Sequence, residues 1–133
     1  MPLLPEGHLL AGRYQIVRVL GHGGMGAVYL AADARLPGKQ WALKEVLEDL
    51  SDTEEREEAR RLFEAEAHLL ATLSHPNLPL ITDYFEEAGR QYLVMEFIEG
   101  ETLEEVVRKR REPLPPEIAL GYALQICEAL DYL

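Results

Sequence analysis

Four glycines near the N-terminus have a spacing that suits phosphate binding. Residues 21–26 read Gly-His-Gly-Gly-Met-Gly, which matches the pattern G-x-G-x-x-G. Because glycine has no Cβ, such a segment lets backbone N–H groups approach a polyphosphate closely. An ordinary flexible hairpin turn would explain the same glycines. The candidate phosphate-binding residues are Gly21, His22, Gly23, Gly24, Met25 and Gly26.

A lysine inside an apolar strand pattern follows the glycines. Residues 41–46 read Trp-Ala-Leu-Lys-Glu-Val, and period-two alternation puts Ala42, Lys44 and Val46 on one face. A small residue beside a lysine suits an adenine ring with phosphates beyond it, and Val28 stands two residues after the last glycine. An edge-strand lysine that reaches water is the structural alternative.

A carboxylate interrupts the apolar stripe of the next predicted helix. The stripe has helical spacing and comprises Ala59, Leu62, Phe63, Glu66, Leu70 and Leu73. An inward carboxylate needs a cationic partner, or it costs stability. We therefore expect Glu66 to face inward and to pair with Lys44. Alternatively, Glu66 lies at the margin of the stripe and reaches water.

The elements that must position these residues alternate between strands and helices. Strands are expected at 14–20, 27–31, 40–46, 80–86 and 91–96, with turns at 35–39 and 88–89. Capping boxes at Ser51–Glu54 or Asp52–Glu55 and at Thr102–Glu105 predict a helix ending near Leu73 and a second, short one. A last helix opens at Pro115 and still runs at Leu133. This order predicts an α+β fold with a five-stranded antiparallel sheet and one packed helix, after an irregular N-terminal arm at residues 1–11.

Together these motifs resemble the bacterial serine/threonine protein kinases. The likeness is carried by Arg13-Tyr14, by residues 21–31, by the lysine strand, and by His75-Pro76-Asn77. Residues 93–100, Leu-Val-Met-Glu-Phe-Ile-Glu-Gly, resemble the family's fifth strand and hinge. Trp41 departs from the usual valine, and the spacing from Lys44 to Glu66 is about three residues longer than usual. The resemblance implies an ATP-binding N-lobe at 12–98, with the hinge exit and the start of a C-lobe at 99–133.

The resemblance also implies roles for single residues in binding ATP. Lys44 would contact the α- and β-phosphates, and Glu66 would orient Lys44. Leu20, Val28 and Ala42 would form the apolar walls of the adenine pocket. Met95 would be the gatekeeper residue, while the Glu96 carbonyl and the Ile98 N–H would bond the adenine edge. A dinucleotide-binding fold is the weaker alternative, because it requires a helix directly after Gly26.

Several motifs of the kinase family do not occur in these 133 residues. The sequence has no His-Arg-Asp, no Asp-Phe-Gly and no Ala-Pro-Glu. The proton-accepting Asp and the Mg²⁺ ligands are therefore absent from it, and we expect the chain alone to be inactive. The uncapped last helix indicates a truncated chain whose exposed apolar face invites self-association. The alternative is a non-catalytic module that binds nucleotide or another kinase as a regulator.

Composition limits the remaining possibilities. The formal net charge of −11 argues against a partner that is nucleic acid. With a single cysteine, Cys127, we expect no internal disulfide and no metal site of the chain's own. The absence of a signal-like start favours the cytoplasm. A membrane anchor beyond residue 133 and the identity of the protein substrate lie outside what the sequence determines.

Overall fold

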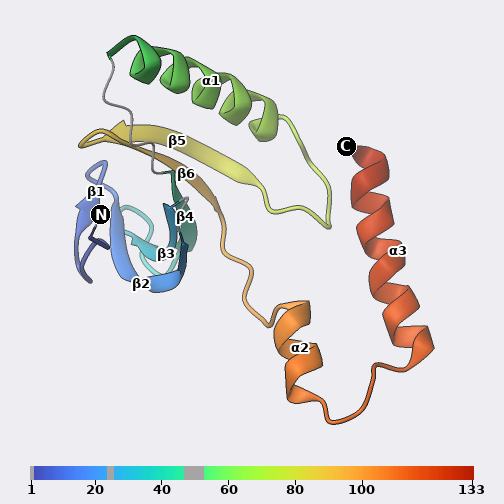
Figure 1. The fold of residues 1–133 in the computed structure, drawn as a ribbon. Helices are drawn as coiled ribbons and strands as arrows, with labels where there is room; N and C mark the ends of the chain where they lie inside the picture. The colour runs from blue at the N-terminus through green and yellow to red at the C-terminus, as the bar shows by residue number, and fades with distance from the viewer. Residues whose placement is uncertain (1, 24–25, 47–52) are drawn as a thin grey trace. The chain divides into compact units, whose positions relative to one another are not determined.

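The chain forms two compact units. The computed structural model describes residues 2–23, 26–46 and 53–133. One unit comprises residues 1–74 and 80–97, and the second comprises 75–79 and 98–133. The first unit holds the sheet and helix α1, and the second holds helices α2 and α3 (Figure 1).

The sheet is antiparallel throughout and has the strand order β1-β2-β3-β4-β6-β5. Its strands are β1 (Leu9–Leu10), β2 (Tyr14–Gly23), β3 (Gly26–Asp33), β4 (Gln40–Val46), β5 (Ile81–Glu87) and β6 (Arg90–Glu96). The five predicted strands are therefore confirmed, with longer ends in β2 and β3. The described chain after Gly26 continues as a strand, so the helix that a dinucleotide-binding fold requires does not occur there.

The predicted irregular arm is partly wrong, because it contains the short strand β1. Ala11 and Gly12 take left-handed backbone angles, with φ of 52° and 62°. The Arg13 N–H then donates to the Leu10 carbonyl over 3.0 Å, which closes a tight turn back into β2. Two consecutive left-handed residues are a feature that the sequence pattern did not reveal, since alanine seldom adopts this conformation.

The sheet curls until its opposite sides touch. Strands β2 and β5 are separated by three others in the sheet order, yet the Tyr14 hydroxyl donates to the Asp83 carboxylate over 2.9 Å. The rings of Tyr14 and Phe85 also stack, with centroids 5.7 Å apart. Burial and the Asp83 carboxylate raise the pKa of Tyr14 to about 12, so this hydroxyl remains a donor at neutral pH.

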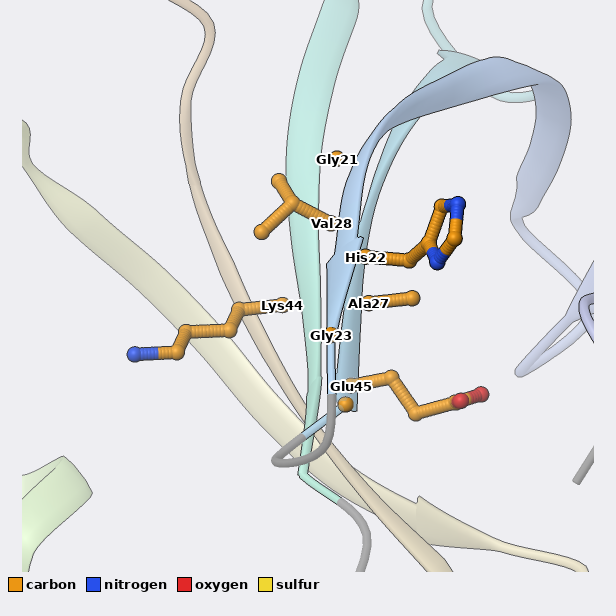
Figure 2. Close-up of a pocket in the computed structure, with 8 residues that line it drawn as sticks. Gly21, His22, Gly23, Ala27, Val28, Lys44 and Glu45 are labelled. Atoms are coloured by element: carbon orange, nitrogen blue, oxygen red, sulfur yellow. The ribbon is translucent and has the colours of Figure 1, made fainter.

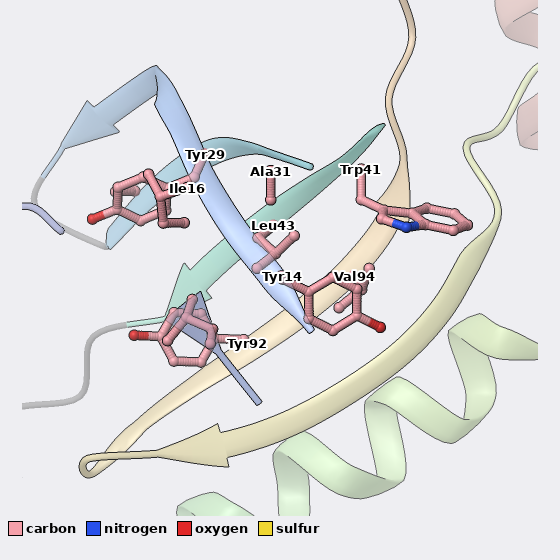
Figure 3. Close-up of a cluster of buried hydrophobic side chains, with 10 residues drawn as sticks. Tyr14, Ile16, Tyr29, Ala31, Trp41, Leu43, Tyr92 and Val94 are labelled. Carbon is pink, nitrogen blue, oxygen red and sulfur yellow. The ribbon is translucent and has the colours of Figure 1, made fainter. Parts of the chain in front are cut away.

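The apolar core fills the inner face of the curl. Figure 3 shows its aromatic and aliphatic side chains gathered between the strands. Tyr29, Leu43 and Val94 are completely buried there and face one another across three neighbouring strands. Because side chains alternate along a strand, the outer face of the same three strands carries the neighbouring residues of each.

A buried carboxylate ties together the ends of three strands. The Asp33 side chain has no exposed surface; it accepts hydrogen bonds from the Arg13 guanidinium at 2.9–3.2 Å and from the Trp41 indole N–H at 3.0 Å. The backbone N–H groups of Arg35 and Leu36 also donate hydrogen bonds to the Asp33 carboxylate. The bond from Trp41 gives a physical reason for tryptophan at this position, where the family resemblance had suggested valine.

Helix α1 (Thr53–Ala71) packs on β5 and β6. Figure 1 shows it lying along these two strands. Its most buried residue is Ala67, while Leu62 and Leu69 are both 65% exposed. Leu62 nevertheless lines a cavity between α1 and β4 together with Ala59, Phe63 and Glu66. These four residues of the predicted stripe therefore share the face toward the sheet, although Leu62 is not buried. The predicted capping residues Ser51 and Asp52 lie outside the described residues.

The second unit contains α2 (Leu103–Lys109) and α3 (Pro116–Tyr132), as the sequence predicts. The Thr102 hydroxyl accepts the Glu105 N–H, so the predicted N-cap is confirmed. The segment 75–79 is held against α3 by a bond from the Asn77 amide to the Gln125 carbonyl. Within the described residues, no helix has the length and apolar character that crossing a membrane requires.

The β5–β6 turn offers a test of backbone strain. Ala88 has φ of 52° and precedes Gly89 at 76°, so replacing Ala88 by glycine removes a steric cost. We expect Ala88→Gly to raise the free energy of unfolding by up to about 1 kcal/mol in urea denaturation. The matched change Ala65→Gly, in the exposed interior of α1, should lower it by about 1 kcal/mol. A loss of stability in Ala88→Gly would contradict the assigned turn.

The Asp33 cluster predicts a pH dependence of stability. The Arg13 guanidinium, together with the other donors, holds the pKa of Asp33 well below its usual range. Its ionised form therefore stabilises the fold above about pH 4, and that contribution is lost as the pH falls toward the folded-state pKa. In acid-unfolding curves, Asp33→Asn should be less stable than the parent at pH 7 and should lose less stability below pH 4. The exposed control Asp131→Asn should follow the parent, and parallel curves for all three proteins would refute the assignment.

Candidate nucleotide-binding site

The glycine segment forms the end of the β2–β3 hairpin. Gly23 pairs with Gly26 at the last register position, and Gly21 pairs with Val28. Gly26 has φ of 139°, a conformation that residues with a side chain rarely adopt. Gly24 and Met25, which the sequence also nominated, lie outside the described residues. The glycines therefore form the end of a hairpin, and the phosphate-binding interpretation requires a pocket beside this hairpin.

A pocket of about 330 Å³ lies at this end of the sheet. Its lining joins the glycine hairpin to strand β4 and comprises Gly21, His22, Gly23, Gly26, Ala27, Val28, Lys44 and Glu45. Figure 2 shows the side chains of Val28 and Lys44 on one side of the strands and those of His22, Ala27 and Glu45 on the other. The volume is within the range of small-molecule sites.

Strand register places the other predicted residues on the same outer face as Lys44. Val28, Lys44 and Leu93 are direct partners across β3, β4 and β6, and Leu30, Ala42 and Met95 form the next row. Direct partners point to the same side of a sheet. The structure therefore brings Val28, Ala42, Lys44 and Met95 together on one face, as the period-two argument predicted.

The predicted ion pair between Lys44 and Glu66 does not form in this structure. Both residues line a cavity of about 300 Å³ between β4 and α1. Among the residues that the structure describes, no ion pair joins them, and both are exposed. Glu66 therefore lies on the side of α1 that faces the sheet, as predicted, but it is exposed and makes no ion pair with Lys44.

The other residues expected around the adenine ring, Leu20 as an apolar wall and Glu96 and Ile98 at its edge, do not all belong to one compact unit. Leu20 is 36% exposed, and Ile98 belongs to the second compact unit. The Glu96 carboxylate accepts the Leu80 N–H at 2.7 Å, while the Glu96 N–H donates to the Leu80 carbonyl at 2.9 Å. Glu96 therefore joins the start of β5 to the end of β6.

Glu45 is a site residue that the sequence reasoning missed. It is only 2% exposed, and its carboxylate accepts bonds from Arg90 at 3.0 Å and from the Tyr92 hydroxyl at 2.8 Å. Burial and this carboxylate raise the pKa of Tyr92. The alternation that places Lys44 on the outer face necessarily places Glu45 on the inner face. The same period-two pattern in the sequence could therefore have predicted that Glu45 is buried. This ion pair holds β4 in register beneath the pocket.

The residues present fit an anionic polyphosphate. Among the described residues, apart from the chain neighbours, no atom lies within 4 Å of the position that a Cβ on Gly21 or Gly23 would occupy, so glycine leaves that space open beside the pocket. Lys44, which carries an ammonium group, lines the same pocket as these glycines. Within the described part of the chain, no cluster of three or more His, Cys, Asp or Glu residues suited to a metal ion occurs.

Comparison with known proteins identifies the family. Residues 14–133 match the protein kinase domain. The chain belongs to this family. Its sequence is 38% identical to the probable serine/threonine-protein kinase YbdM of Bacillus subtilis, over 98% of this chain and 49% of that protein. It is 42% identical to the serine/threonine-protein kinase PrkC of the same organism, over 95% of this chain and 19% of that protein.

A solved structure of the same family has the same fold. The crystal structure of a double mutant of the Mycobacterium tuberculosis PknI kinase domain superimposes with a TM-score of 0.81 and 32% sequence identity. The match covers 98% of this chain and 50% of that one. The predicted resemblance to bacterial serine/threonine kinases and the predicted kinase-like fold are thus confirmed, and the chain spans about half the length of the PknI domain or YbdM.

Two glycines of this kinase hairpin should respond differently to substitution. Gly23→Val puts a side chain into open space beside the pocket, so nucleotide affinity should fall at least tenfold while stability changes by about 1 kcal/mol or less. Gly26→Ala instead forces alanine to the φ of 139° and should cost about 1–3 kcal/mol of stability. Urea denaturation and nucleotide titration of both variants make the measurement. Unchanged nucleotide binding by Gly23→Val would show that the pocket is not used.

Proposed function

We propose that residues 1–133 are the ATP-binding portion of a serine/threonine protein kinase. In the intact enzyme, the γ-phosphate of ATP would be transferred to a Ser or Thr hydroxyl of a protein. The observation that carries this proposal is the pocket of about 330 Å³ that joins the glycine hairpin to Lys44. Membership of the protein kinase family supports the reaction class.

In this proposal each part of the site has a separate task. Backbone N–H groups of the glycine hairpin hold the phosphates, and the Lys44 ammonium balances their charge. Val28 and Ala42 provide the apolar surface for the adenine ring, beside Met95. Glu66, which lines a cavity together with Lys44, orients Lys44 when nucleotide is bound. In the intact enzyme the proton-accepting Asp and the Mg²⁺ ligands would come from outside residues 1–133.

A non-catalytic module is the second candidate function. It remains open because residues 1–133 contain the candidate nucleotide pocket but neither His-Arg-Asp nor Asp-Phe-Gly. Such a module would bind nucleotide or another kinase and regulate it without transferring phosphate. A module that binds nucleotide would use the same pocket, and phosphate transfer by the native protein separates the two candidates.

We also propose self-association and a cytoplasmic location. The apolar residues Leu120, Leu124 and Leu130 of α3 are each more than half exposed, and a surface of this kind favours association between copies. Light scattering should therefore give a mass that increases with concentration, and a constant monomer mass would exclude it. Cell fractionation of the native protein would separate a cytoplasmic protein from one that carries a membrane anchor outside residues 1–133.

Nucleotide titration tests the proposed site directly. We expect saturable ATP binding with a Kd below about 1 mM, and at least a tenfold loss of affinity in Lys44→Met, because a charge-assisted phosphate contact is removed. Glu66→Gln should lose less, because it acts only through Lys44. The matched control is Lys39→Met, which replaces an ammonium stacked on Trp41 and should bind like the parent. Equal affinity in Lys44→Met and Lys39→Met would refute the site.

Phosphate transfer by the isolated chain should be undetectable. Transfer requires metal ions that neutralise charge and a group that positions the attacking hydroxyl, and the family motifs that supply them do not occur here. Radiolabelled ATP with Mg²⁺ and a generic acceptor protein provides the assay. Incorporation that depends on Lys44 would overturn the assignment of residues 1–133 as inactive alone.

A further inference from the structure

A second, smaller pocket lies between α1 and strands β5 and β6, within the first compact unit. Its volume is about 80 Å³, and it is lined by Arg60, Phe63, Glu64, Tyr84, Phe85, Glu86 and Gln91. None of these residues lines the glycine-hairpin pocket. The nucleotide proposal therefore leaves this pocket without a function.

Gln91 is the unusual residue of this second pocket. It is 9% exposed, and its Oε1 is buried without a hydrogen-bond partner in the part of the chain that the structure describes. Leaving such an acceptor unsatisfied costs free energy, so buried polar atoms almost always have partners. Gln91 is paired in register with Glu86 on β5, whose side chain lies on the same face of the sheet. The acceptor therefore lacks a donor at the wall of a pocket.

The charges around the pocket favour a cation. Arg60 is already engaged, because its guanidinium contacts Glu57 at 2.9 Å and Glu64 at 3.0 Å. Because Glu86 also lines the pocket, the lining carries two carboxylates, Glu64 and Glu86, against the single guanidinium of Arg60, so its net charge is negative. A neutral donor would form the hydrogen bond to Gln91 but would not be attracted by the negative charge. A cationic donor would form the same hydrogen bond and would also be attracted by the carboxylates.

The aromatic walls favour a flat cation. The rings of Phe63 and Tyr84 meet edge to face, with centroids 6.4 Å apart. The Tyr84 hydroxyl lies 2.6 Å from His68 Nε2, which fixes the position of its ring. Guanidinium is planar, stacks on aromatic faces and carries several N–H donors in a fork, whereas ammonium is a compact point charge.

The size of the pocket limits what can enter. A cavity of about 150 Å³ is needed to enclose benzene, and this pocket has about half that volume. It can therefore hold the end of one side chain, while the remainder of the ligand stays outside. A polypeptide that presents a single side chain meets this condition, and a fully enclosed metabolite does not.

We propose that the pocket between α1 and β5–β6 binds the guanidinium group of an arginine side chain presented by a partner polypeptide. One N–H donates to Gln91 Oε1, the cation faces the carboxylates of Glu64 and Glu86, and its plane lies against the rings of Phe63 and Tyr84. Phe63 also lines the cavity that contains Lys44 and Glu66. The bound arginine therefore contacts a residue that lines the same cavity as Lys44.

The test is a titration of the ¹⁵N-labelled full chain with a short peptide, acetyl-Gly-Ser-Arg-Ser-Gly-amide, at 150 mM salt. We expect saturable shifts of the Gln91 side-chain amide and of backbone amides in residues 60–64 and 84–91. The same peptide with neutral citrulline in place of arginine should bind at least about tenfold more weakly, because the charge is removed. The lysine peptide should also bind more weakly, because it lacks the planar fork.

Two variants separate a specific site from general attraction to an acidic protein. Gln91→Met removes the acceptor and should weaken arginine-peptide binding at least about tenfold, with an unfolding temperature equal to or above that of the parent. Gln40→Met, an exposed glutamine of β4, is the matched control and should bind like the parent. Glu86→Gln, at an exposed position, should weaken binding severalfold even if Gln91→Met fails to fold.

Three results would overturn the proposal. The first is no saturable shift at any peptide concentration, which would leave water as the partner of Gln91. The second is equal binding of the arginine and citrulline peptides. The third is a set of shifts that spreads over the acidic surface of α1 and stays unchanged in both Gln91→Met and Glu86→Gln.

Discussion

Strand β4 has three consecutive side chains whose alternation determines the rest of the structure. Leu43 is completely buried, Lys44 is exposed on the outer face, and Glu45 is buried on the inner face with Arg90 and Tyr92. A slip of one residue would put the lysine into the core and an apolar residue at the pocket. Because a buried carboxylate without its guanidinium is strongly unfavourable, the Glu45–Arg90 pair opposes that slip. The position of Lys44 therefore depends on a contact made on the opposite face of the sheet.

The second buried carboxylate acts at the other end of the same strands. Asp33 holds Arg13, Trp41 and the following turn, and its bonds join the ends of β2, β3 and β4. The curl of the sheet, closed by Tyr14 and Asp83, then encloses the aromatic core on one side. The outer face carries Val28 and the exposed Lys44, which both line the candidate nucleotide pocket. In this lobe, polar contacts set the register and apolar contacts supply the bulk of the burial.

Helix α1 forms a wall of two separate spaces. On one side it forms the cavity with Lys44 and Leu93, and on the other it forms the smaller pocket with Tyr84 and Gln91. Phe63 lines both. A helix that buries few residues of its own can shift at modest cost, because little apolar contact area is lost. Among the described residues no ion pair joins Lys44 to Glu66, which is consistent with a helix that is held mainly by Phe63, Ala67 and the Tyr84 contacts.

Local patterns in the sequence determined the strands, the helices and the outward position of Lys44, since alternation and capping depend only on neighbouring residues. The same local patterns also predicted the glycine hairpin and the resemblance to protein kinases. Tertiary structure alone decided the short strand β1, because two left-handed residues make its turn. It likewise decided the buried networks of Asp33 and Glu45, whose partners lie up to 47 residues away in the chain. The predicted stripe of α1 faces the sheet, but Leu62 and Glu66 stay exposed beside a cavity. A stripe of helical period fixes which residues share a face but not how closely that face packs on the sheet.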